Sequence, residues 1–295
     1  MKNIIIDVDT GIDDALAIIL AAKLCKEDVL GITVCGGNVK LEEATENTLR
    51  IAGLIGWNVP VYAGASKSIT GSEFVHAYDY HGTNGICDVS LPAPTGSKAN
   101  EEASDFIARM ARERKVNIIC LAAPTNIARA IAKNPKVAEN IEKIYLMGGA
   151  FNVPGNQTEY AEYNFFQDPK AVETILQNAK DVYIVPLDVT NRCLVSDSSL
   201  KNLGQGAVIR FVSEAVENWY RFFGYPKKRS FELYDPLTLA AAVTGEYLSF
   251  KEDMVGIHVS GLREGEVFSG GKYAARVAFD ISADKFNKAF FSLLE

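Results

Sequence analysis

One stretch near the amino terminus, IIIDVDTGIDDALAIIL at residues 4–20, predicts the architecture of the whole chain. A run rich in Ile and Val at residues 3–8 favours a strand, and residues 9–13 form a polar turn that contains a glycine. Apolar residues then recur at helical spacing over residues 14–26. The stretch therefore predicts a strand, a turn and a helix.

The same unit recurs along the chain. A strand at 32–34 precedes a helix at 41–54, a strand at 116–121 precedes a helix at 125–133, and a strand at 143–147 precedes a helix at 168–177. Further elements are expected at 182–187, 207–223, 255–259, 273–279 and 283–294. Strands that alternate with helices predict an α/β fold, here an open and mostly parallel sheet with helices on both faces. Since no linker or low-complexity tract interrupts the pattern, we expect one domain over residues 1–295.

Composition excludes several classes of protein. With 48% hydrophobic and 23% charged residues, 295 residues can bury a large core. The net charge of −7 argues against a nucleic-acid partner. The longest early apolar run falls short of a membrane span, and the five scattered cysteines fit reduced thiols, so we expect a cytoplasmic protein that does not bind membranes.

Four carboxylates gather where the first strand meets the first helix: Asp7, Asp9, Asp13 and Asp14. One aspartate there would be an ordinary helix cap, and the same interpretation applies to Asp235 when it is considered alone. Four carboxylates repel one another, and no Lys or Arg lies between residues 2 and 23. A bound cation would relieve that repulsion. Oxygen ligands without nearby His or Cys favour Ca²⁺ or Mg²⁺ over zinc.

Residues 7–15, DVDTGIDDA, resemble the amino-terminal signature of the inosine-uridine-preferring nucleoside hydrolases, which cleave the N-glycosidic bond of ribonucleosides. Further motifs similar to those of the family follow in its order: GGN at 36–38, HGTNG at 81–85, PTNIA at 124–128, MGGA at 147–150, GN at 155–156, AEYN at 161–164, LDVT at 187–190 and DPL at 235–237. The resemblance covers essentially the whole chain. It implies a Rossmann-like nucleoside hydrolase fold and a ribonucleoside substrate.

The resemblance also implies a role for each site residue. It implies one Ca²⁺ per subunit, held by Asp9, Asp14, Asp235 and the backbone carbonyl of Thr125. It implies that Asp13 activates the attacking water, and that Asp7 supports the site from behind. It assigns the ribose hydroxyls to a further set of residues: Asn38, Asn156, Glu162, Asn164 and Asp235.

The proposed chemistry suits these residue types. Breaking the bond to the base builds positive charge on the ribose ring, which a pocket lined by carboxylates stabilises. A hard cation can bind two vicinal hydroxyls and a water together, so a 2′-deoxy substrate is expected to react poorly.

Two positions depart from the family pattern. Thr10 stands where many members have proline, and Tyr234 stands where many have a histidine that is thought to protonate the leaving base. Tyrosine is a weaker acid at neutral pH. Our hypothesis is that His81, together with Tyr234 or Tyr225, faces the base and helps it to leave; the alternative is that His81 only braces its loop.

Two other functions stay open at this point. A hydrophobic strand that runs into Asp7-Val8-Asp9-Thr10 also resembles the start of the haloacid-dehalogenase-type phosphatases, in which Asp7 would be the nucleophile and magnesium the metal. A calcium-dependent protein that binds nucleosides or ribose without catalysis would have the same pocket chemistry. The family resemblance further implies a homo-oligomer, a tetramer or a dimer, and a role in purine or pyrimidine salvage.

Overall fold

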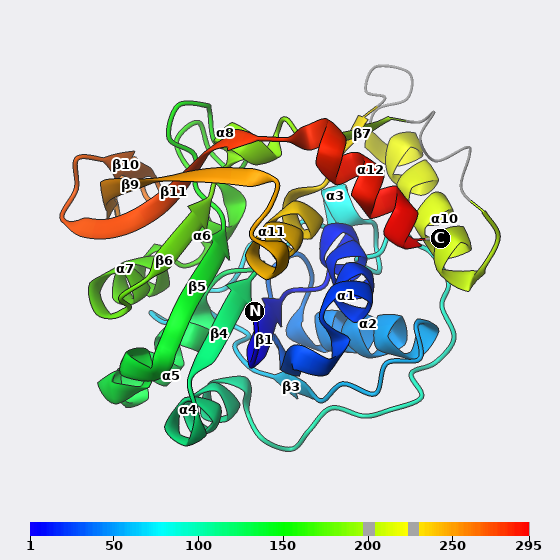
Figure 1. The fold of residues 1–295 in the computed structure, drawn as a ribbon, viewed down its shortest axis with the longest axis horizontal. Coiled ribbons are helices and arrows are strands. Elements are labelled where there is room, and N and C mark those ends of the chain that lie inside the picture. Colours follow the sequence, from blue (N-terminus) through cyan, green and yellow to red (C-terminus); the bar gives the residue numbers. More distant parts are fainter. Residues whose placement is uncertain (197–203, 224–229, 295) are drawn as a thin grey trace.

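A nine-stranded sheet forms the centre of the computed structural model, which describes residues 1–196, 204–223 and 230–294 (Figure 1). The strand order is β10-β9-β11-β6-β5-β4-β1-β2-β3, and all neighbours from β11 to β3 pair in parallel. Only β9 runs in the opposite direction, so its pairings with β11 and with the edge strand β10 are antiparallel. The strands are β1 Ile4–Val8, β2 Val29–Val34, β3 Val61–Ala63, β4 Val116–Cys120, β5 Ile141–Met147, β6 Val182–Val185, β9 Leu248–Ile257, β10 Val267–Ser269 and β11 Tyr273–Ile281. The predicted open, mostly parallel sheet is confirmed.

Helices cover both faces of the sheet, and β1 therefore buries its side chains on both sides. Ile4 and Ile6 join one apolar cluster, which also contains residues of α1 Ile12–Leu24, α2 Leu41–Leu54, α10 Ala207–Phe223, α11 Tyr234–Thr244 and α12 Ala283–Leu294. Ile5 joins the opposite cluster, which contains residues of α4 Ala103–Glu113, α5 Thr125–Lys133 and α7 Pro169–Asn178. The architecture is thus a sheet between two helical layers.

Short elements complete the described chain. They are α3 Tyr78–His81, α6 Tyr163–Gln167, α8 Leu187–Thr190, the 3₁₀ turns η1 Lys26–Asp28 and η2 Pro135–Asn140, and a two-stranded antiparallel ribbon of β7 Leu194–Ser196 and β8 Ser230–Glu232.

Some predicted boundaries were wrong. α1 begins at Ile12, two residues before the predicted start, because Gly11 already takes the extended conformation of a helix cap. β9 spans Leu248–Ile257, which is longer than the predicted 255–259. Its first half carries exposed charged residues, which an edge strand tolerates but a buried strand does not. The elements α4 and β3 were not predicted.

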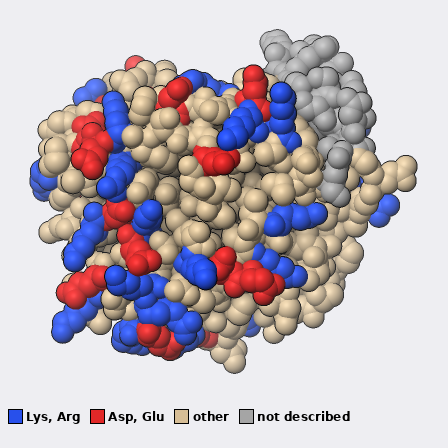
Figure 2. All heavy atoms as spheres, in the orientation of Figure 1, with Lys and Arg blue, Asp and Glu red and all other residues tan. Residues whose placement is uncertain are grey.

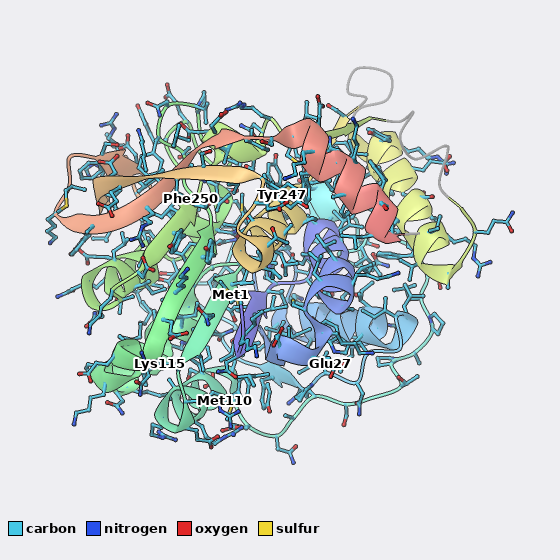
Figure 3. All side chains as sticks on the ribbon, in the orientation of Figure 1. Met1, Glu27, Met110, Lys115, Tyr247 and Phe250 are labelled. Carbon is cyan, nitrogen blue, oxygen red and sulfur yellow. The ribbon has the colours of Figure 1, made fainter. Side chains whose placement is uncertain are left out.

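The two ends of the parallel strands differ in what they carry. Met1 and Lys115 lie at the amino ends of β1 and β4 (Figure 3). The carboxyl ends of β1, β4 and β5 lead into the loops that hold the predicted motifs, and this is the end at which ligands bind in such sheets.

On the face drawn in Figure 2, basic and acidic side chains are intermixed and form no continuous basic patch among the residues described there. Within the described residues, no helix combines the length and the hydrophobicity needed to cross a bilayer.

Candidate active site

A cavity of about 300 Å³ opens at the carboxyl ends of the parallel strands. Its volume suits a small ligand. The described residues that line it come from segments far apart in the sequence: Asp13, Asn38, Ala77, Tyr80, His81, Leu121, Met147, Asn156, Gln157, Glu162, Tyr163, Asn164, Tyr234 and Asp235. The fold therefore gathers the motifs singled out in the sequence, and no Lys or Arg is among these lining residues.

Three buried carboxylates meet at one side of this cavity. One oxygen each of Asp13, Asp14 and Asp235 lies within 4.8 Å of the others. Asp13 and Asp14 stand in the first turn of α1, and Asp235 stands in the first turn of α11. Two helix amino termini, where carboxylates are favoured, therefore point their first turns at the same place.

Backbone groups fix the orientation of Asp14. Its Oδ2 accepts a hydrogen bond from Gly11 N (2.9 Å), and its Oδ1 accepts one from Asp9 N (3.3 Å). Asp9 lies next to the three carboxylates but outside that set of mutually close oxygens. Both oxygens of Asp9 accept from Asn38, at 2.7 Å from its backbone N and 3.0 Å from its Nδ2.

Asn38 therefore links two of the predicted metal ligands. Its Nδ2 also donates to Asp14 Oδ2 at 3.1 Å. Gly37 makes this arrangement possible, since a Cβ at that position would lie 1.9 Å from Asp9 Oδ2. Asn38 lines the cavity, and its hydrogen bonds in this structure are to the carboxylates of Asp9 and Asp14.

Burial raises the pKa of each carboxyl in this group. For Asp14 and Asp235 the pKa lies well above its usual range, first because burial penalises the charged form and then because neighbouring carboxylates repel it. The pKa of Asp13 is also raised, chiefly by burial. No Lys or Arg is among the described residues that line the cavity, so a bound positive charge would offset this cost.

Asp13 has an oxygen that the protein does not use. Its Oδ1 is buried and has no hydrogen-bond partner within the described part of the chain. An unsatisfied buried carboxylate oxygen in a cavity is an acceptor available to a ligand, a water or a metal ion.

Asp7 faces away from the cavity. Its Oδ1 accepts from Thr33 Oγ1 (2.5 Å) and Asn126 Nδ2 (2.9 Å), and Cys120 Sγ lies 3.5 Å from its Oδ2. The side chain is fully buried between β2 and β4. Asp7 is thus bound to neutral donors behind the site, which leaves it without access to a substrate phosphate.

The loop after β4 is held through Thr125. The side-chain hydroxyl of Thr125 donates to Asp168 Oδ2 (2.8 Å), which also accepts from Ile69 N (2.6 Å). Because the hydroxyl of Thr125 is bound to Asp168, the backbone carbonyl is the oxygen that Thr125 would offer to a metal ion.

The opposite wall of the cavity is built on α6. Glu162 caps this helix: its Oε1 accepts from Asn164 N (2.8 Å), and its Oε2 accepts from Phe165 N and Gly149 N (3.0 Å each). Asn164 Nδ2 donates to the carbonyls of Leu121 (3.0 Å) and Met147 (3.1 Å). Asn164 Oδ1 takes part in neither of these hydrogen bonds and can accept one from a ligand.

Asn156 belongs to the same wall. Its Oδ1 accepts from Tyr163 N at 2.8 Å, which leaves the amide nitrogen as a donor. The wall therefore offers a donor from Asn156 and an acceptor from Asn164, the pair of functions that a sugar hydroxyl requires.

His81 and Tyr234 form a third side. His81 is buried, and its Nδ1 accepts from the backbone N of Ile12 at 3.2 Å. Burial raises the pKa of Tyr234 above its ordinary value, and the charges of Glu232 and Asp13 raise it further. Tyr80 packs edge-on against His81, with ring centroids 4.9 Å apart. Asp13, His81 and Tyr234 thus line one cavity, as their predicted roles require.

The aromatic side chains Trp219, Tyr220 and Phe222 of α10 are not among the residues that line the cavity. Trp219 is fully buried and packs edge-on against Tyr80 and Phe231, whereas Phe222 is half-exposed. Trp219 therefore supports Tyr80 from behind. Tyr225, named as an alternative partner of His81, lies outside the described residues.

Sequence reasoning missed several residues that hold the site. Tyr163 Oη and Gln167 Nε2 both donate to the carbonyl of Val75, so α6 is tied to the loop that leads to His81. Asp188 accepts from Phe151 N and Asn152 N (2.9 Å each) and holds the loop that carries Asn156. Tyr163 and Asp188 lie in the motifs already noted, which was the available signal.

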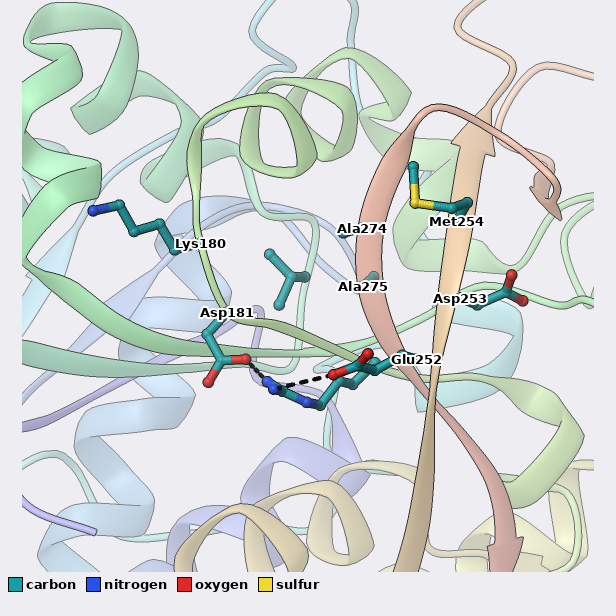
Figure 4. Close-up of a pocket in the computed structure, with 9 residues that line it drawn as sticks. Lys180, Asp181, Glu252, Asp253, Met254, Ala274 and Ala275 are labelled. Atoms are coloured by element: carbon teal, nitrogen blue, oxygen red, sulfur yellow. Dashed lines mark ion pairs between the residues drawn. The ribbon is translucent and has the colours of Figure 1, made fainter.

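A larger hollow, of about 450 Å³, lies at the amino end of β6 and is lined by Asp181, Glu252 and Arg276 among others (Figure 4). Arg276 pairs with Asp181 and with Glu252, at 3.6 Å from the latter. Lys180 and Arg276 both line this hollow, so its carboxylates have basic neighbours, unlike those of the first cavity.

Comparison with known proteins gives a consistent result. Residues 4–288 match the family described as "Inosine-uridine preferring nucleoside hydrolase". Uridine nucleosidase 1 of Arabidopsis thaliana is 32% identical over 268 residues, which cover 88% of this chain and 80% of that protein. The pyrimidine-specific ribonucleoside hydrolase RihA of Klebsiella pneumoniae is 31% identical over 263 residues, which cover 87% of this chain and 84% of that protein.

Solved structures are similar over nearly the whole chain. The plant nucleoside hydrolase PpNRh1 superposes with a TM-score of 0.94 at 26% identity and covers 99% of this chain and 98% of its own. The purine-preferring ribonucleoside hydrolase from Gardnerella vaginalis superposes with a TM-score of 0.91 at 29% identity, with the same coverage.

Proposed function

Because this chain belongs to the inosine-uridine preferring nucleoside hydrolase family and is a ribonucleoside hydrolase, we propose a specific division of labour in its site. Ca²⁺, one per chain, is bound by Asp9, Asp14, Asp235 and the carbonyl of Thr125. Asp13 activates the water that attacks the ribose carbon of the N-glycosidic bond. Neither a phosphatase nor a non-catalytic binding protein agrees with this family membership.

The observation that carries the proposal is the meeting of Asp13, Asp14 and Asp235 beside one cavity, which Asp13 and Asp235 line, with an unpartnered oxygen on Asp13. All donors of the set are oxygens, which fits a hard divalent cation. Such a cation, when bound, polarises a water molecule and the vicinal hydroxyls of the ribose.

Asp13 is suited to the role of base. Its raised pKa, caused by burial, brings the carboxylate closer to the pH at which a general base must accept a proton. Its unpartnered Oδ1 gives the proton an acceptor. The buried carboxylates also stabilise the positive charge that develops on the ribose ring.

The ribose is oriented by the wall on α6. The amide nitrogen of Asn156 and the Oδ1 of Asn164 supply a donor and an acceptor to the sugar, with Glu162 beside them. Asn38 and Asp235 complete the binding set from the carboxylate side. A sugar that lacks a matching hydroxyl leaves one of these groups unpaired, at a cost of about 1–3 kcal/mol.

The base lies between His81 and Tyr234, which assist its departure. Both side chains line the cavity. The raised pKa of Tyr234 makes it a poor proton donor but leaves its hydroxyl able to hydrogen-bond.

We also propose that residues 1–295 act as one domain and assemble as a homo-dimer or homo-tetramer in the cytoplasm. The five described cysteines are all free and buried, which suits a reducing compartment. Light scattering on the purified protein tests the oligomeric state.

The test of the proposed function is release of reducing sugar from a panel of ribonucleosides that includes uridine and inosine. We expect turnover that EGTA abolishes and Ca²⁺ restores, no hydrolysis of 4-nitrophenyl phosphate, and poor turnover of 2′-deoxyuridine. Asp13→Asn should reduce kcat by about 10²–10⁴-fold, the usual contribution of a general base. Full activity of Asp13→Asn would contradict the assignment, and chelator-resistant turnover would contradict the metal.

A further inference from the structure

One nitrogen of the His81 ring is already bound to the backbone. The backbone N of Ile12, the first residue of α1, donates to His81 Nδ1 at 3.2 Å, and the contact is buried. A backbone N–H can only donate, so Nδ1 must be the acceptor. In a neutral imidazole the single proton is then on Nε2.

The surroundings oppose a second proton on this ring. A proton on Nδ1 would point at the N–H of Ile12 and would place a positive charge at the positive end of the α1 dipole. Burial also lowers the pKa of His81 to about 3, because the charged form loses its solvation. The ring is therefore neutral at working pH.

The ring is also held in a fixed position. A Cβ on Gly11 would lie 2.5 Å from His81 Nδ1, so the ring rests directly on the backbone at the start of α1. Tyr80 packs against its edge. The backbone of His81 is held as well, because its N donates to Ala77 O (2.9 Å) and its O accepts from Cys87 N (2.7 Å).

The other ring nitrogen is available to a ligand. His81 lines the cavity together with Asp13 and Tyr234. No described residue forms a hydrogen bond with its Nε2. The Nε2–H is therefore a donor whose direction is set by the Ile12 contact on the far side of the ring.

We propose that His81 serves the departing base as a fixed, neutral hydrogen-bond donor through Nε2–H, and does not transfer a proton to it. This inference rests on the proposed function. The substrates that fit are nucleosides whose base carries an acceptor beside the glycosidic nitrogen, such as O2 of a pyrimidine or N3 of a purine.

The proton balance of the reaction is consistent with this role. The C–N bond breaks and its electron pair goes to the base, while water gives its hydroxyl to the ribose carbon and its proton to Asp13. The base gains its proton afterwards from solvent, and Asp13 releases to solvent the proton that it took from water. His81 stabilises the negative charge that the base carries in between, as a preorganised donor does in an oxyanion hole.

Two substitutions of His81 distinguish hydrogen-bond donation to the base from proton transfer to it. In His81→Gln the amide nitrogen reaches about as far as Nε2, whereas in His81→Asn it reaches only as far as Nδ1. We expect His81→Gln to keep kcat/KM for uridine within about tenfold of the wild type and His81→Asn to lose about 10²–10³-fold, the usual effect of removing one such donor. With 4-nitrophenyl riboside, whose leaving group is stable as an anion, the difference in kcat/KM between the two variants should disappear.

The protonation of the ring is measured directly by NMR of the ¹⁵N-labelled histidines in the metal-free protein. The chain has three histidines, so the signal that disappears in His81→Gln identifies the ring. We expect the correlation pattern of an Nε2–H tautomer at neutral pH. An Nδ1–H or doubly protonated pattern, or a His81→Gln variant as impaired on uridine as His81→Asn, would overturn the proposal.

The outcome is separable from that of the proposed function. If the wild type cleaves no nucleoside, or Asp13→Asn cleaves 4-nitrophenyl riboside normally, the proposed function fails while the NMR pattern still reports on the ring. If both activities depend on Asp13 but the tautomer is wrong, only the role of His81 fails.

Discussion

Gly11→Ala should disable the site with little effect on the fold. Gly11 has φ −88°, which any residue can adopt, so an alanine introduces no backbone strain. Its Cβ, however, would lie 2.5 Å from His81 Nδ1 and 2.8 Å from Asn38 Nδ2. Ordinary contacts begin at 3.4 Å, so the ring must move by about 0.9 Å and the amide by about 0.6 Å.

A displacement of this size is large for a catalytic group. A misplacement of about 1 Å can cost about 10²-fold in rate, and it would also lengthen the Ile12–His81 hydrogen bond beyond its useful range. The stability cost should be about 1–3 kcal/mol, the usual cost of adding a methyl group to a packed site, so the variant should still fold.

The assay compares two substrates with and without excess Ca²⁺. A loss confined to uridine indicates movement of His81, and a loss shared with 4-nitrophenyl riboside and relieved by Ca²⁺ indicates movement of Asn38, which contacts Asp9 and Asp14. Gly96→Ala is the matched control, since a Cβ there meets no atom within 4 Å. Wild-type kcat/KM for uridine in Gly11→Ala would refute the reasoning.

The remaining predictions concern the cation and the sugar. Saturation with Ca²⁺ at about 100 times its Kd should stabilise the protein by about 2.7 kcal/mol and raise Tm by about 4 °C in calorimetry, whereas no difference between EGTA and Ca²⁺ would contradict a calcium site. Burial and repulsion raise the pKa values of Asp14 and Asp235 above those of the unfolded chain. The metal-free protein should therefore lose stability as the pH rises from about 4. The gain in Tm from Ca²⁺ should accordingly increase between about pH 5 and 8. Asp188→Asn should raise KM for uridine by about fivefold with little change in kcat, because one loop hydrogen bond is worth about 1 kcal/mol. An unchanged KM would show that this loop does not position Asn156.

Local pattern was enough to identify the main elements. The alternation of β1 and the helical spacing of α1 reflect periodicities that each segment carries within itself. The same holds for α2 and α12, which begin and end close to the predicted positions. The edge strand β9 was predicted too short, because its exposed charged half has no apolar pattern.

The sequence alone determined that the chain is an α/β protein with the motifs of nucleoside hydrolases and a carboxylate cluster after its first strand. Only the tertiary structure decided which carboxylates meet: Asp13, Asp14 and Asp235 do, and Asp13 and Asp235 line the cavity, whereas Asp7 is bound to Thr33 and Asn126 behind it. The tertiary structure also decided the tautomer of His81, because Ile12, whose backbone N donates to its ring, lies 69 positions away in the sequence. The physical reason is that periodicity fixes which face a side chain is on, whereas its hydrogen-bond partner and its solvation depend on segments that meet only when the sheet has assembled.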